Sequence, residues 1–312
     1  MRLPARERVR HVWKGLRKRG LIESARGFLL FRLLNRYWRF RTHEFVAETE
    51  FGSLIAGSTR EVIGRYLCYF GVWEPNTSQW IANQLRPGDT FIDVGAHIGY
   101  YSLLASKCVG STGRVIAIEA SPQNYTALKA NLERNNVTNV RAVNAAVSDR
   151  AGTLTLYHDP NRNAGLTTTI PQPGFEAECQ VSANTLSALL KSGELESARL
   201  IKIDVEGAEA AVLSDLVSTL DRLSPTCEVV AEIAPDRAAD GKDLDAALMS
   251  LQRAGFRTYA IENEYYPSNY YPLTYCSPRR YAPPRLVEGR VHEQTDIIFS
   301  RGNPLHAANS VV

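Results

Sequence analysis

The chain has 312 residues, of which 44% are hydrophobic and 22% charged; these are ordinary globular proportions and exclude a largely disordered chain. Its five cysteines are scattered and form no CxxC pair, which argues against a disulfide framework or a zinc ribbon and favours a reducing compartment. The formal net charge is only +3, but residues 1–42 hold thirteen Lys and Arg against Glu7 and Glu23, a net +11 that leaves −8 for the rest.

The basic N-terminal extension, residues 1–44, contains the pattern of an amphipathic helix. Apolar residues recur at helical spacing between residues 30 and 38, while Arg32, Arg36 and Arg39 fall on another face. Such a helix can pack on its own domain, lie on an anionic membrane surface or bind nucleic acid. The apolar run is shorter than the roughly 20 residues of a bilayer span, and no secretory signal is visible. We expect a cytoplasmic protein, with peripheral contact at the inner membrane surface as the alternative.

Residues 45–86 are predicted to form a helical lead-in that ends before Pro87 and Gly88. Strand and helix patterns then alternate from 87 to 301, with an inserted hairpin at 153–159 and 178–186, and residues 302–312 are expected to be a disordered tail. The predicted strands of the main sheet are 90–95, 114–120, 140–147, 199–207, 227–234, 256–263 and 295–301. Short apolar runs separated by helices are typical of a mainly parallel α/β sheet that is covered on both faces.

The first strand ends in a glycine turn that carries an acid, in the stretch FIDVGAHIGYYS (91–102). A dinucleotide site would need GxGxxG, whereas here Asp93 precedes Gly95 and Gly99. A carboxylate in this crevice repels a phosphate, at a cost of several kcal/mol at about 4 Å, and favours a cation. The glycines still allow a ligand to approach the backbone closely, so we expect a ligand that carries positive charge.

Glu119 ends the second strand, 20 residues after Gly99. That interval is typical of an acid that accepts hydrogen bonds from ribose hydroxyls. A ligand with a ribose and a cationic portion in place of a pyrophosphate is S-adenosylmethionine, which we predict as the cofactor. The alternative is that Asp93 and Glu119 only cap helices.

Four segments in this order resemble the FkbM family of class I S-adenosylmethionine-dependent methyltransferases: FIDVGAHIGYYS, VIAIEASPQNYTALKANLERNN, VNAAVSD and IKIDVEGAEAAVL. The resemblance covers roughly residues 70–301 and leaves out the basic arm. It implies a Rossmann-like sheet of seven strands whose last strand is antiparallel. It also implies methyl transfer to oxygen, on sugars or on polyketide-type natural products.

The resemblance implies a set of cofactor-binding residues: Glu74, Asp93, Gly95, Gly99, Glu119, Ala120, Ser121, Asn144, Ala145 and Ala146. Two positions depart from the family pattern. His97 stands where the family commonly has Asn, which removes an amide that could brace the turn, and Ser187 stands where an Asp is frequent. We assign a catalytic role to neither.

The best candidates for a catalytic base lie in IKIDVEGAE, where Asp204 ends a central strand and Glu206 opens the next turn. A base that takes the proton of an acceptor hydroxyl accelerates the transfer by roughly 10²–10⁴-fold. Glu209 is a candidate substrate contact, although Glu206 and Glu209 could instead stabilise a helix N-terminus. A magnesium site formed by Asp204, Glu206 and Glu232 is the alternative use of these acids; we predict no metal.

The acceptor is expected to meet a tyrosine-rich segment after the sixth strand, with Tyr265, Tyr266 and Tyr270 as candidate contacts, unless these residues only pack on the domain. The sequence therefore predicts an O-methyltransferase for a hydroxyl of a small molecule or glycan. One alternative is an RNA methyltransferase that uses the basic arm, disfavoured by the acidic catalytic domain. The other is a module that binds the cofactor without catalysis.

Overall fold

In a computed structural model, the chain divides into two compact units, residues 1–75 with 264–281 and residues 76–263 with 282–312. The structure describes residues 42–159, 167–234, 241–263, 282–287 and 294–302, together with the single positions 33, 36, 37, 270 and 291. Most of the basic arm and the tail from residue 303 lie outside this part. The amphipathic helix and the disordered tail therefore stay predictions.

The first unit contains a β-hairpin where the predicted helical lead-in begins, so that prediction is wrong for residues 45–58. Strand β1 (Glu44–Glu48) pairs antiparallel with β2 (Leu54–Ser58), and helix α3 (Val62–Phe70) follows. The sequence EFVAE alternates exposed and half-buried side chains, which is the period of a strand and not of a helix. Gly52, with φ 74°, lies in the connecting turn.

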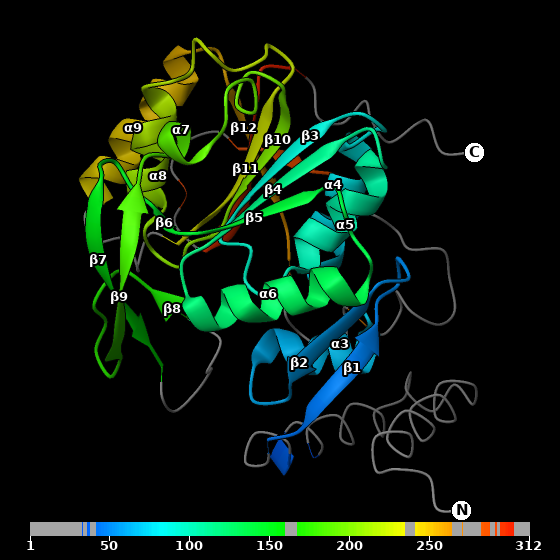
Figure 1. The fold of residues 1–312 in the computed structure, drawn as a ribbon. Coiled ribbons are helices and arrows are strands. Elements are labelled where there is room, and N and C mark those ends of the chain that lie inside the picture. Colours follow the sequence, from blue (N-terminus) through cyan, green and yellow to red (C-terminus); the bar gives the residue numbers. More distant parts are fainter. Residues whose placement is uncertain are drawn as a thin grey trace, which may run out of the picture. The chain divides into compact units, whose positions relative to one another are not determined.

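The second unit is built on one large sheet with the strand order β13-β12-β14-β11-β10-β3-β4-β5 (Figure 1). Its strands are β3 (Thr90–Val94), β4 (Arg114–Glu119), β5 (Val140–Asn144), β10 (Ala198–Ile203), β11 (Glu228–Ile233), β12 (Arg257–Ile261), β13 (Arg285–Leu286) and β14 (Thr295–Ser300). The pairs among β5, β4, β3, β10 and β11 are parallel, and β14 is antiparallel to both of its neighbours. The predicted mainly parallel sheet with an antiparallel last strand is confirmed. The eighth strand is the two-residue β13, which pairs with the edge of β12.

Six helices of the second unit are described: α4 (Pro75–Gln84), α5 (Tyr100–Val109), α6 (Pro122–Arg134), α7 (Leu186–Leu189), α8 (Glu209–Val217) and α9 (Gly241–Arg253). Apolar side chains of α8 and α9 form one core with the central strands, including Ile201 and Ile203 of β10. Because side chains alternate along a strand, Lys202 points to the opposite face. Among the described residues, no helix combines the length and apolar character that crossing a membrane requires.

The inserted hairpin forms a separate sheet with the order β6-β9-β7-β8. It comprises β6 (Ala146–Val147), β7 (Gly152–His158), β8 (Thr167–Thr168) and β9 (Glu176–Asn184). Leu156 and Val181 pack inside it with two alanines, which gives the insertion a small core of its own. The predicted hairpin is confirmed, and β8 extends it by pairing with the end of β7.

Candidate active site

The turn after β3 is held by backbone contacts that suit glycine. The N–H groups of Gly95 and Ala96 both donate to the carbonyl of Ile118, at 2.9 and 3.0 Å. Gly95 has φ 85°, and a Cβ atom built on it would lie 1.7 Å from the carbonyl oxygen of Asp204. The turn after β3 is thus pressed against the turn after β10, and only glycine fits between them.

Asp93 is fully buried at the end of β3 and keeps one oxygen available. Its Oδ2 accepts a hydrogen bond from the Ser102 hydroxyl at 2.6 Å, while Oδ1 has no partner among the described residues. Burial raises the pKa of Asp93, and the Lys202 charge and the Ser102 hydrogen bond oppose this shift. A buried carboxylate oxygen without a partner is costly, and a positively charged donor such as an ammonium group would satisfy it.

Glu119 joins the turns after β3 and β4. Its Oε2 accepts from the His97 N–H at 2.7 Å, and its Oε1 accepts from the Ser121 N–H at 2.8 Å. Burial raises the pKa of Glu119, against the opposing effects of His97 and the Ser121 amide. Each carboxylate oxygen has a second lone pair, so both can still accept a ribose hydroxyl. His97 braces this turn through its backbone and has φ 50°, a conformation for which His, like Asn, is enriched.

Other predicted cofactor residues gather at the ends of β4 and β5. Asn144 lies opposite Glu119 in the register of these strands and donates to the carbonyls of Glu119 and Ala120, at 2.8 and 3.0 Å. Ser121 caps α6. Ala145 and Ala146, which follow β5 in the chain, are buried. Gly99, with φ 92°, begins α5. Glu74 is buried but belongs to the first unit, so its approach to the cofactor stays a prediction.

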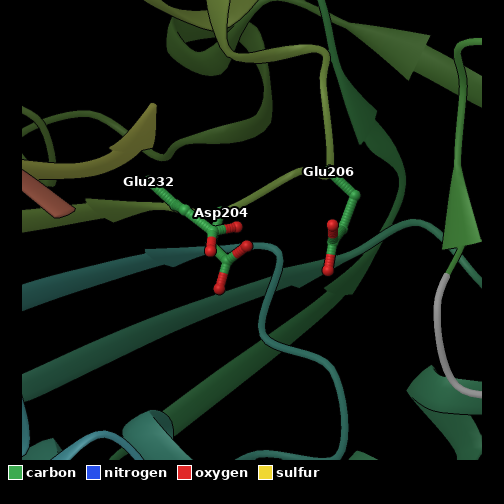
Figure 2. Close-up of side chains that lie close together, drawn as sticks. All are labelled: Asp204, Glu206 and Glu232. Atoms are coloured by element: carbon green, nitrogen blue, oxygen red, sulfur yellow. The ribbon is translucent and has the colours of Figure 1, made fainter. Parts of the chain in front are cut away.

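The turn after β10 brings three carboxylates together: Asp204, Glu206 and Glu232 (Figure 2). One oxygen of each lies within 4.8 Å of the others, and all three residues are half-buried. Glu206 has φ 55° in the turn, whereas Glu232 comes from β11. The Lys202 ammonium donates to Asp204 Oδ2 at 2.8 Å and supplies one compensating charge. Carboxylates at this spacing could hold a divalent cation, so the predicted absence of a metal stays a prediction.

The family model described as the methyltransferase FkbM domain matches residues 93–258, which is more than half of the chain. The chain belongs to the FkbM methyltransferase family. The predicted family is thereby confirmed.

Two curated relatives show the extent of the match. The chain is 32% identical over 162 residues to the 31-O-demethyl-FK506 methyltransferase FkbM of Streptomyces tacrolimicus, covering 42% of this chain and 60% of that protein. It is 31% identical over 157 residues to the methyltransferase sdnD of Sordaria araneosa, covering 41% and 60%. The chain therefore spans about 60% of the length of these relatives.

Among solved structures, a SAM-dependent O-methyltransferase from Thermotoga maritima matches with a TM-score of 0.42 and 16% identity, covering 85% of this chain and 80% of that one. The fold class rests on the strand order of the large sheet, which places β14 antiparallel between β12 and β11.

In this FkbM-family chain, sequence reasoning missed a buried acid on β14 that belongs to the same region. Asp296 Oδ2 accepts from the Thr77 hydroxyl at 2.6 Å, and burial raises the pKa of Asp296 against the effects of Thr77 and Lys202. Lys202 is itself 4% exposed and lies 4.7 Å from the ring centre of Tyr101. The sequence signal for these two residues was a charged side chain inside an apolar strand, Lys202 in β10 and Asp296 in β14. One charged residue in a strand does not by itself indicate a site, because the sequence does not show which groups lie beside it.

The predicted substrate residues are only partly described by the structure. Glu209 is 3% exposed, and its carboxylate accepts from the N–H groups of Val205 and Gly207, so its visible role is to hold the turn. Burial raises the pKa of Glu209, and the Gly207 amide opposes this. Tyr270 is buried in an aromatic cluster of the first unit. Tyr265 and Tyr266 lie outside the described residues, and substrate contact by any of these stays a prediction.

Proposed function

We propose that the protein is an O-methyltransferase that transfers the methyl group of S-adenosylmethionine to a hydroxyl of a sugar, glycan or polyketide-type molecule. One observation carries the proposal: two sets of acids meet where Gly95 lies against the carbonyl of Asp204. One set, with Asp93, is buried and suited to a positively charged hydrogen-bond donor, and the other, with Glu206, is half-buried and suited to proton transfer.

The buried acids hold the cofactor in this proposal. Asp93 Oδ1, which lacks a partner among the described residues, accepts from the amino group, and Glu119 accepts from the ribose hydroxyls. Ala120, Ser121 and Asn144 line the adenine side. When bound, S-adenosylmethionine supplies a methyl group that its sulfonium has already activated, so the protein contributes mainly orientation, for which about 7–11 kcal/mol is available.

The half-buried acids handle the acceptor. The acceptor hydroxyl donates its proton to Asp204 or Glu206 as the oxygen is methylated. Lys202 occupies Oδ2 of Asp204, and we place the transferred proton on Oδ1. The side chain of Asp204 is 25% exposed, so the proton can then pass to water. General base catalysis of this kind contributes roughly 10²–10⁴-fold.

The name of one relative supports oxygen as the methylated atom. The 31-O-demethyl-FK506 methyltransferase of Streptomyces tacrolimicus is named for a reaction at oxygen on a natural product. The acidic surroundings of Asp204 would repel a phosphorylated backbone, which favours an uncharged hydroxyl acceptor over RNA.

Methyl transfer can be measured with S-adenosylmethionine labelled in the methyl group and a panel of methyl glycosides, nucleotide sugars and hydroxylated macrolides. We expect at least one hydroxyl compound to be methylated. With the best acceptor of the panel, Asp204→Asn and Glu206→Gln should bind the cofactor within about threefold of wild type but lose about 10²-fold or more in kcat.

The other candidate functions give different results. An RNA methyltransferase would label RNA and bind it with a strong dependence on salt. A binding module would be stabilised by the cofactor yet methylate nothing in the panel. Normal kcat in both variants would exclude Asp204 and Glu206 as bases.

A further inference from the structure

The backbone of Glu206 adopts a conformation that its residue type disfavours. Its φ is 55°, in the left-handed region that residues other than Gly, Asn, Asp and His rarely adopt. A strained residue of this kind persists only where its surroundings fix it, and such residues cluster at functional sites. The Glu206 carboxylate has an oxygen within 4.8 Å of an oxygen of Asp204 and of Glu232, so the position of this backbone bears on the carboxylate cluster (Figure 2).

Hydrogen bonds from two separate parts of the chain hold this turn. The Glu209 carboxylate accepts from the N–H groups of Val205 and Gly207, at 3.3 and 3.0 Å. The carbonyl of Glu206 accepts a hydrogen bond from the Thr168 hydroxyl at 2.7 Å. Glu209 belongs to the family motif, but Thr168 comes from the inserted sheet, 38 residues away in sequence.

Thr168 is itself firmly placed. It is 2% exposed and lies in β8, opposite Tyr157 of β7. Its hydroxyl oxygen accepts from the N–H of Ile170 at 3.0 Å, which leaves the hydroxyl proton for the Glu206 carbonyl. Because the Glu206 carbonyl can only accept, the Thr168 hydroxyl is the donor of this hydrogen bond.

We propose that Thr168 is a positioning residue of the methyl-transfer site, which fixes the backbone of Glu206 so that its carboxylate meets the acceptor. The inserted sheet is then part of the catalytic arrangement. The inference rests on the proposed function, because it gives Glu206 a role in the reaction. It makes a separate claim, that this role depends on one hydroxyl group outside the family motif IKIDVEGAE.

The test compares three substitutions in the full chain. Thr168→Val removes the hydroxyl and keeps the shape, Thr168→Ser keeps the hydroxyl, and Thr153→Val makes the same change at an exposed position of β7. Hydrogen exchange is followed in peptides that cover residues 204–210, and kcat and KM are measured with the best acceptor of the panel. Each activity measurement is repeated in a Glu206→Gln background.

We expect Thr168→Val to speed exchange of the amides of residues 205–207 at least about tenfold, with the β3 and β4 peptides unchanged. Its kcat should fall about 10–100-fold, since a small misplacement of a reacting group costs up to about 10². KM and cofactor affinity should stay within about threefold. Thr168→Ser and Thr153→Val should match wild type, and Thr168→Val should have no further effect in the Glu206→Gln background.

Unchanged exchange at 205–207 in Thr168→Val overturns the inference whatever the acceptor proves to be. So does a full additional loss of kcat in the Glu206→Gln background, because Thr168 would then act by another route. If Glu206→Gln alone keeps normal kcat, the proposed base fails, and the inference fails with it. If Glu206→Gln is impaired but Thr168→Val is not, the inference fails alone.

Discussion

The turn after β3 and the turn after β10 lie against each other, yet their acids have different surroundings. Asp93 and Glu119 are 0% and 5% exposed and are surrounded by hydroxyl and amide donors. Asp204 and Glu206 are half-buried and belong to a cluster of carboxylates. A buried acid can bind a cationic donor that takes no part in proton transfer, whereas an acid that gives a proton away must reach water. In the proposed function, this difference separates cofactor binding from proton transfer.

The largest expected effect comes from adding a side chain at Gly95, where the two turns touch. Gly95→Ala would place a Cβ 1.7 Å from a backbone oxygen of Asp204 at a positive φ, so the turns must separate. We expect a loss of about 3 kcal/mol or more in the free energy of unfolding, measured by urea denaturation.

Gly152→Ala is the matched control for this glycine, since nothing lies within 4 Å of a Cβ at that position. It should stay within about 0.5 kcal/mol of wild type. Equal stability of the two variants would show that the turns are not in close contact.

An Asp→Asn substitution in the turn after β3 should affect cofactor binding, and the same substitution in the turn after β10 should affect turnover. Asp93→Asn removes the buried charge at the cofactor turn, and we expect the Kd for S-adenosylmethionine to rise about 10–100-fold in calorimetry. Asp204→Asn should leave this Kd within about threefold while kcat falls. A raised Kd in Asp204→Asn together with an unchanged Kd in Asp93→Asn would contradict the roles proposed for the two turns.

A smaller effect concerns pH and the buried acid on β14. Burial raises the pKa of Asp296 above its ordinary value of 3.8. A carboxyl whose pKa is higher in the folded chain contributes stability below pH 3.8, and this contribution is lost as the pH rises through the raised pKa. Asp296→Asn avoids the loss. Its Tm relative to wild type should therefore increase by about 2–4 °C between about pH 4 and pH 8.

Asp221→Asn, at an exposed position, is the control for this pH effect and should show no such change relative to wild type. A relative Tm of Asp296→Asn that falls as the pH rises would contradict the sign of the argument.

The smallest expected effect is that of a chelator. Lys202 already supplies a positive charge beside Asp204, so we expect EDTA to change kcat by less than about twofold. A loss of activity in EDTA that Mg²⁺ restores in wild type but not in Glu232→Gln would instead show that the carboxylate cluster binds a cation.

The cofactor side of the site could be predicted from local patterns. A buried strand runs into Asp93 and Gly95, and the next strand ends at Glu119. These short patterns are enough to predict an acidic crevice after the first strand. The hairpin at 44–58 was missed because strands of five residues leave little room for a period to show, and the stretch was read as helix.

The sequence by itself determined the alternation of strands and helices, the family and the acids at the strand ends, because each depends on residues close together in the chain. The tertiary structure decided which distant groups meet. It brings Glu232 to Asp204, Lys202 between acids of separate strands, and the Thr168 hydroxyl to the carbonyl of Glu206. Parallel strands align their carboxyl ends across gaps of many residues, and no local pattern records which side chains then come together.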